Sequence, residues 1–441
     1  MAFPGSGASG NFFEQILADL LQLMGGAASG GARVDLARTL AQGVATGGEP
    51  EGNVDPVDRI QFEQLAHVAE LHVAELTGLP LTPTGAPVEV AVVGPGAWAW
   101  QTVEDWRFLL DAMTGTAGDD SGGDDSPGGD PGSGDASGGG AAAVPGEERG
   151  TPPGPPASAP DVPGLGLADL GRPLDEPEVR PADLVARWMA TMGPMLAAMQ
   201  LGSAVGHLAR STMGPYELPI PRPGSRLLVV PANATRFAED WSLAPDEVRL
   251  WVCLREMTVQ AVLSRPHVAA RVRELLVRVV QGMAAEAAGL VDRLQDIDPS
   301  QPDALQGLIG DPTSLMNLEP SPARQRASDD LMAVVAALLG YVEHVLDLAA
   351  ARLLGGRGAI AEAWRRRQVD RETSERAAEM MFGLDLGPAQ IDRGADFVRG
   401  VRDRAGDDGL ARLWSGARTL PTPSEVDAPG LWLERISLDD A

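Results

Sequence analysis

A long tract of glycine, proline, serine and aspartate divides this chain into two parts. Residues 116–181 contain few large apolar side chains, and their acidic runs include Asp119-Asp120 and Asp124-Asp125. Such a segment buries too little apolar surface to offset the conformational entropy lost on ordering. The aspartates do not form a twelve-residue calcium loop that ends in glutamate. The sequence therefore predicts a disordered acidic linker, and a folded core has to come from the flanking parts.

Four regions follow from this division. Residues 1–31 are rich in glycine, serine and alanine, and predict a flexible tail around a short apolar helix at Phe12–Met24. Residues 32–115 form a predicted N-terminal helical part, because apolar residues recur there at the spacing of a helix face. Residues 182–437 carry dense helix signals and predict a C-terminal helical domain.

The predicted elements are mainly helical. Two helices are expected between residues 34 and 77, separated by residues 48–53, and Thr102 is expected to cap another. Ser328 is the expected N-cap of a long helix that ends at Gly355. Further helices are predicted at 184–199, 232–241, 245–263, 371–382, 388–404, 410–414 and 431–436, with short strands at 88–93 and 227–230. The expected fold is mainly α, a multi-helix domain with one or two very short strands.

Charge and composition exclude several functions. The formal net charge is −27, which disfavours binding to nucleic acid or to an anionic membrane. All 35 basic residues are arginine, so lysine Schiff-base chemistry is excluded. The longest apolar run, Leu331–Val342, is shorter than the roughly 20 residues that span a bilayer. We expect a cytoplasmic protein with an unidentified protein partner, no nucleic acid and no membrane.

The segment Leu250–Gln260 lies on a strongly predicted helix, because Pro245 suits a first helical position and acidic residues follow it. Its centre reads Arg255-Glu256-Met257-Thr258-Val259. Several other blocks stand around this segment, namely Leu228–Asn233, Asp246–Trp251, Leu339–Asp347, Phe397–Arg399 and Leu420–Thr422.

As a set, these blocks resemble the actinobacterial zincin-like family, whose members are described as zinc-dependent metalloproteases or hydrolases. The likeness is good over residues 183–437 and looser over residues 34–113. One branch of the family is associated with the biosynthesis of a deazaflavin cofactor. The resemblance implies a zincin-like helical domain, with the segment Leu250–Gln260 at the place of a His-Glu-x-x-His motif.

In the zincin pattern, two histidines four residues apart bind zinc, and the glutamate between them is the general base. A third ligand comes from a later helix. Carried over by position, the ligands would be Arg255, Val259 and Leu339, and the base would be Glu256. A guanidinium has no free lone pair and the other two side chains are hydrocarbon, so none can bind zinc. The resemblance therefore implies a degenerate site with a vestigial base and without the family's zinc.

Arg255 shares its predicted helix face with apolar side chains, where an unpaired guanidinium would be costly. Glu343 and Asp347 lie four residues apart on the later helix. If the two helices pack as in the family, an ion pair from Arg255 to one of these carboxylates would replace the metal bridge. The alternative is that the Arg255 side chain extends to solvent.

Other patterns support weaker interpretations. His344 and His267 could build a displaced metal site with neighbouring carboxylates. Gly94–Ala99 matches a dinucleotide fingerprint, although a simple turn between a strand and a helix fits as well. Arg365–Arg367 predicts a solvated face, and Cys253 predicts a small buried hydrophobic side chain.

The favoured function is a zincin-like protein that has lost its zinc ligands and serves as a non-catalytic helical scaffold or binding protein. The main alternative is an active metal-dependent hydrolase or peptidase with a displaced site. A third is a nucleotide-binding protein that uses Gly94–Ala99. The sequence identifies neither a substrate nor a particular partner.

Overall fold

The structure of the protein is a computed structural model that describes residues 30–115, 181–295, 320–355, 357–370 and 373–438. The predicted tail helix at Phe12–Met24 and nearly all of the predicted linker lie outside these residues. The chain divides into two units, residues 1–118 with 187–441 and residues 119–186. Of the second unit, only the first residues of one helix are described. The N-terminal and C-terminal helical parts pack together within the first unit.

The N-terminal part contains α2 (Gly30–Thr46), α3 (Pro56–Thr77), β1 (Glu89–Val92), α4 (Pro95–Asp105) and α5 (Arg107–Thr114). The Asp55 side chain caps α3 by accepting a hydrogen bond from the Val57 amide, and Gly78 ends it in the left-handed conformation. β1 pairs in parallel with β2 (Arg226–Val229), with Val92 opposite Val229. The two predicted short strands are confirmed.

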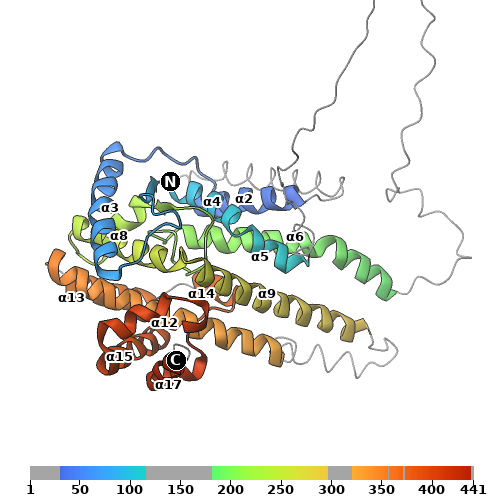
Figure 1. The fold of residues 1–441 in the computed structure, drawn as a ribbon. Coiled ribbons are helices and arrows are strands. Elements are labelled where there is room, and N and C mark those ends of the chain that lie inside the picture. The colour runs from blue at the N-terminus through green and yellow to red at the C-terminus, as the bar shows by residue number, and fades with distance from the viewer. Residues whose placement is uncertain (1–29, 116–180, 296–319, 356, 371–372, 439–441) are drawn as a thin grey trace, which may run out of the picture. The chain divides into compact units, whose positions relative to one another are not determined.

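The other regular elements of the described chain are helices (Figure 1), and the mainly α class is as predicted. The helices are α6 (Pro181–Ala209), α7 (Pro231–Asp240), α8 (Pro245–Leu263), α9 (Pro266–Gln295), α12 (Pro322–Leu353), α13 (Arg357–Val369), α14 (Thr373–Met381), α15 (Pro388–Ala411), α16 (Pro423–Asp427) and α17 (Pro429–Leu438), with 3-10 turns η2 (Arg412–Trp414) and η3 (Ala417–Thr419). The fold class is therefore mainly α.

Helix α8 is buried on all sides. Every residue from Leu250 to Leu263 is buried, because α3, α7 and α12 pack against it. The polar side chains of this stretch, Arg255 and Glu256 among them, are buried with the apolar ones. The sequence predicted one apolar face, whereas the whole circumference lies in the core. Buried polar groups on such a helix require partners, and these define the candidate site.

Helices α12 and α15 touch through glycines. A Cβ on Gly340 would overlap the carbonyl group of Gly394, and a Cβ on Gly394 would overlap that of Ala336. The glycines thus allow α12 and α15 to pack closely, and α12 also packs against α8. By length and composition α12 could cross a membrane, but 67% of its apolar window is buried inside the protein. Its apolar character is that of a core helix.

Two predicted helix starts are wrong. The long helix α12 begins at Pro322 rather than after Ser328, and the hydroxyl of Ser321 accepts a hydrogen bond from the Arg324 amide. Proline at the first helical position and the cap at Ser321 move the start seven residues towards the N-terminus. Thr102 does not cap a helix, since it lies inside α4 and donates its hydroxyl to the Trp98 carbonyl.

Candidate functional site

Arg255 is the centre of the polar site on α8. Its side chain is only 9% exposed. Nη1 forms an ion pair with Glu256 and donates a hydrogen bond of 3.2 Å to the Tyr216 carbonyl. The guanidinium carbon lies 4.7 Å from the centroid of the Trp364 ring of α13, a cation–π distance. The arginine is therefore held inside the protein and does not extend to solvent.

Glu256 is held from both sides. One carboxylate oxygen pairs with Arg255, and the other accepts a hydrogen bond of 2.7 Å from the Tyr216 amide. The Gly214 backbone lies against this carboxylate, since a Cβ there would be 2.5 Å from Glu256 Cδ. Burial raises the pKa of Glu256, while Arg255 and then the Tyr216 amide oppose that rise. Both carboxylate oxygens thus have protein donors.

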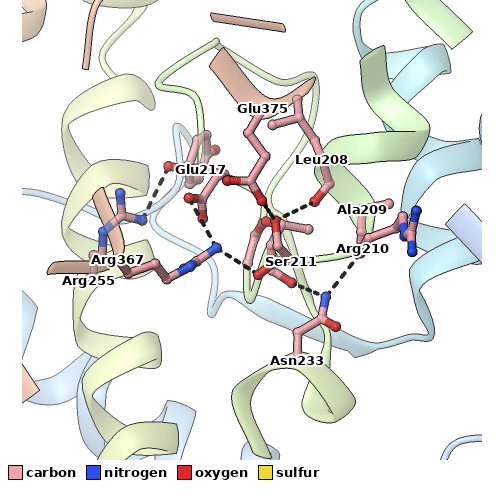
Figure 2. A network of polar contacts seen from close by, with 12 residues as sticks. Leu208, Ala209, Arg210, Ser211, Glu217, Asn233, Arg255, Arg367 and Glu375 are labelled. Atoms are coloured by element: carbon pink, nitrogen blue, oxygen red, sulfur yellow. Dashed lines mark hydrogen bonds and ion pairs between the residues drawn. The ribbon is translucent and has the colours of Figure 1, made fainter. Parts of the chain in front are cut away.

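The backbone that covers Glu256 belongs to residues 210–225, which we call the α6–β2 loop. Residues 212–221 are all buried, although they form no regular secondary structure. A loop in this position needs partners for its backbone groups. Asn233 of α7 donates to the carbonyls of Ala209 and Thr212 at 3.0 and 2.6 Å, and Arg367 of α13 donates to that of Ser211 at 2.8 Å (Figure 2).

Charged groups hold the loop at two more points. Arg367 pairs with Glu217 of the loop at 3.4 Å, as Figure 2 shows. Arg222 of the loop pairs with Asp105 of α4 at 2.7 Å, and both side chains are more than nine-tenths buried. The Arg222 guanidinium also lies 5.2 and 5.5 Å from the ring centroids of Trp98 and Trp106. The loop is therefore fixed over α8 by α4 and α13.

Two of the three degenerate ligand positions meet in one small cavity. Arg255, Leu339 and Glu343 line it, together with Glu217, Val342, Trp364, Gln368, Leu386 and Ile391. Its volume is about 20 Å³, room for a single water molecule. Val259 is buried but does not line the cavity. The fold thus brings together Arg255 of α8 and Leu339 of α12, which are 84 residues apart in the sequence.

The carboxylate that pairs with Arg255 in the structure is Glu256. Glu343 shares the small cavity with Arg255, and Asp347 lies one helical turn further along α12, where it is exposed. An additional ion pair from Arg255 to Glu343 or Asp347 stays a prediction.

His267 and His344 lie outside this cavity. Burial lowers the pKa of His344, and so does Arg402, whereas Asp407 and Asp347 raise it. His267 lies beside Arg265 and Trp414 at the start of α9. Within the described ranges, no three His, Cys, Asp or Glu side chains are placed to hold a metal ion. The residues that the resemblance places at the ligand positions, one guanidinium and two hydrocarbons, do not fit zinc.

The fingerprint segment Gly94–Ala99 forms a turn from β1 into α4. The amides at the start of α4 are already occupied, because Glu51 accepts hydrogen bonds from Gly96 and Ala97 at 2.7 and 3.1 Å. A pyrophosphate would need those donors. The segment therefore forms the turn between a strand and a helix.

Sequence reasoning missed the roles of Arg367 in the site and of Glu51 at the start of α4. The arginine triplet was predicted as a solvated face, which holds for Arg365 and Arg366, whereas the Arg367 side chain is 14% exposed and points to the loop. The helical spacing Ile360, Ala363, Trp364, Arg367 was the available signal for a buried face. Glu51 gave no such signal, since its role depends on a contact 45 residues away.

Fold and site together define a mainly helical protein built around a buried motif helix whose central pair is arginine and glutamate. The comparisons identify the family. A model of the zincin-like metallopeptidase family matches residues 33–433, and the chain belongs to that family. The crystal structure of a candidate hydrolase with a novel fold from Chloroflexus aurantiacus is similar, with a TM-score of 0.54 and 19% identity over 91% of this chain and 97% of that one. No curated protein matches the chain.

Proposed function

We propose that this chain is a non-catalytic member of the zincin-like family in which the buried Arg255–Glu256 pair replaces the metal centre. One observation carries the proposal. Arg255, which the resemblance places at the first zinc-ligand position, is buried and pairs with Glu256, which the resemblance makes the general base. A permanent cation therefore stands where the family pattern places a metal cation.

The surroundings of Glu256 support the loss of catalysis. A general base needs a water molecule polarised for attack and a lone pair that can accept its proton. Here both carboxylate oxygens have protein donors, and the α6–β2 loop lies against the side chain. The adjoining cavity of about 20 Å³ is too small for a peptide group with its neighbours. Glu256 acts as a structural acceptor that holds the loop on α8.

The proposed role is that of a helical scaffold or binding protein in the cytoplasm, with a protein as its partner. The polar site then makes this part of the fold rigid, because it joins α8, α13 and the buried loop through charged hydrogen bonds. The site fixes the relative positions of elements from distant parts of the sequence.

Hydrolysis assays test this proposal. The full chain, supplied with zinc, is incubated with a mixture of peptides and compared with Glu256→Gln and with the exposed control Glu362→Gln. We expect all three proteins to release no product above the buffer rate. Hydrolysis by the wild type that the control retains and Glu256→Gln abolishes would overturn the proposal and favour an active hydrolase.

A further inference from the structure

Helix α3 has two apolar faces, and the described part of the chain covers only one of them. The covered face packs against α8, α12 and β1, and its buried residues are Phe62, Ala66, Ala69 and Val73. The opposite face carries apolar residues that are 57, 55, 37 and 59% exposed, namely Val57, Ile60, Val68 and Leu71. A surface helix normally presents polar side chains on its outer face. The outer face of α3 departs from that pattern.

These four residues, with Gln64 between them, form a single stripe that we call the α3 stripe. At about 100° per residue, the five positions fall within about 80° of one another around the helix, and at 1.5 Å per residue they extend over about 21 Å of its length. The described chain has eleven exposed large apolar residues, and four of them lie on this one face. Exposed apolar residues that are contiguous in this way mark an interaction surface, whereas scattered ones do not.

The α3 stripe has the same spacing in both directions from Gln64. Ile60 and Val68 lie four residues to either side, and Val57 and Leu71 lie seven residues to either side. A second α3 placed antiparallel, with a two-fold axis through Gln64, would set Val57 against Leu71 of the second copy and Ile60 against Val68 of the second copy. Each contact of a two-fold interface occurs twice. The pattern therefore fits a second copy of this chain.

The polar groups around the stripe are complementary to a second copy as well. Gln64 lies on the axis, where its amide group can both donate to and accept from its equivalent. Glu63 and His67 are exposed on one flank of the stripe, and the antiparallel arrangement brings each Glu63 beside His67 of the second copy. These groups have opposite charges when the imidazole is protonated. The Glu63 carboxylate also disfavours an anionic membrane or nucleic acid as the occupant.

We propose that the α3 stripe is the interface of a symmetric homodimer, in which two α3 helices pack antiparallel about Gln64. A contact between single helices is smaller than the roughly 1,600 Å² of a standard interface, so the dimer is reversible, with a Kd of about 1–100 µM. The proposal is independent of the Arg255–Glu256 pair, because the two sites share no residue.

Sedimentation equilibrium of the full chain tests the interface. At 0.15 M salt the Debye length is about 8 Å, which screens the repulsion between two chains of net charge −27. Leu71→Glu places a carboxylate against Val57 of the second copy, and the matched control Leu431→Glu makes the same change on α17. Both leucines are more than half exposed, so the fold tolerates both changes. We expect equal affinity in wild type and control, and a loss of about tenfold or more in Leu71→Glu.

Cysteine cross-linking tests the position of the two-fold axis. The native Cys253 is buried and does not compete. Gln64→Cys places the two thiols on the axis, so mild oxidation should give a covalent dimer. Ile60→Cys places each thiol about 12 Å along the helix from its equivalent, so it should cross-link only when it is mixed with Val68→Cys.

Three results would overturn the proposal. The first is a full chain that stays monomeric up to about 200 µM, which would leave the stripe to the N-terminal segment or to a different protein. The second is a dimer whose affinity Leu71→Glu leaves unchanged. The third is a dimer in which Ile60→Cys cross-links to itself as fast as Gln64→Cys does.

Discussion

Replacement of Arg255 by methionine tests whether the arginine is the counterion of a buried carboxylate. Methionine keeps an unbranched side chain against Trp364 and removes the guanidinium. Glu256, which is 3% exposed, then keeps the Tyr216 amide as its only described donor. The α6–β2 loop also loses the hydrogen bond from Arg255 to the Tyr216 carbonyl.

The expected cost follows from the loss of one partner of a buried pair, about 3–5 kcal/mol at neutral pH. Its pH dependence has a definite sign. Burial raises the folded-state pKa of Glu256 above its unfolded value, so the stability contributed by this group is present at low pH and lost as the pH rises. Loss of Arg255 removes the strongest opposing influence and raises the folded-state pKa further. The deficit of Arg255→Met should therefore be smaller at about pH 5 than at about pH 8.

Urea denaturation of the wild type, Arg255→Met and the exposed control Arg365→Met, each at both pH values, measures these differences. The control should stay within about 0.5 kcal/mol of the wild type. The double variant Arg255→Met/Glu256→Gln should recover part of the lost stability, since it removes the unpaired charge. A single variant that matches the control at both pH values would refute the role of Arg255 as counterion.

Three further predictions concern the core. Gly340→Ala should destabilise the protein by about 1–3 kcal/mol in urea denaturation, because the new Cβ would overlap the backbone of α15. The control Gly289→Ala has open space around the new Cβ and should be neutral or stabilising. The two tyrosines should show no phenolate absorbance near pH 10 in the folded protein, because burial raises the pKa of Tyr341 to about 12 and that of Tyr216 further. Their contribution to stability is present below the unfolded-state pKa of about 10 and is lost as the pH rises from there through the folded-state values. Ordinary titration of either tyrosine would contradict their burial. Cys253 should resist thiol reagents at about pH 8 until the chain unfolds, because burial and then the charge of Glu256 raise the pKa of its thiol to about 12. Rapid labelling of the native protein would show that α8 is accessible.

Local signals in the sequence predicted the helices well where capping chemistry is unambiguous. Pro245 with the two acidic residues after it predicted the start of α8 correctly. The start of α12 was missed because two serines, Ser321 and Ser328, offer similar caps, and the choice depends on packing. The Ser321 amide donates to Glu286 of α9, a contact that no local pattern encodes. Helix starts therefore depend partly on distant partners.

The candidate site was predictable only in part. Its centre at Arg255 and Glu256 and the relation to Leu339 came from the resemblance to the family, and in the structure Arg255 and Leu339 line one cavity. The burial of the α6–β2 loop had no signature, because its glycines and prolines are typical of surface turns. That burial depends on donors from three separate helices, namely Asn233 of α7, Arg255 of α8 and Arg367 of α13, and such long-range partners cannot be read from composition or periodicity.

The most direct test of the central claim is the zinc content of the purified chain after equilibration with excess zinc and removal of the unbound metal. If the Arg255–Glu256 pair replaces the metal, mass spectrometry should find no stoichiometric zinc, and Glu256→Ala should have the same metal content as the wild type. One zinc per chain in the wild type that Glu256→Ala or His344→Ala removes would contradict the account and place a metal in this protein.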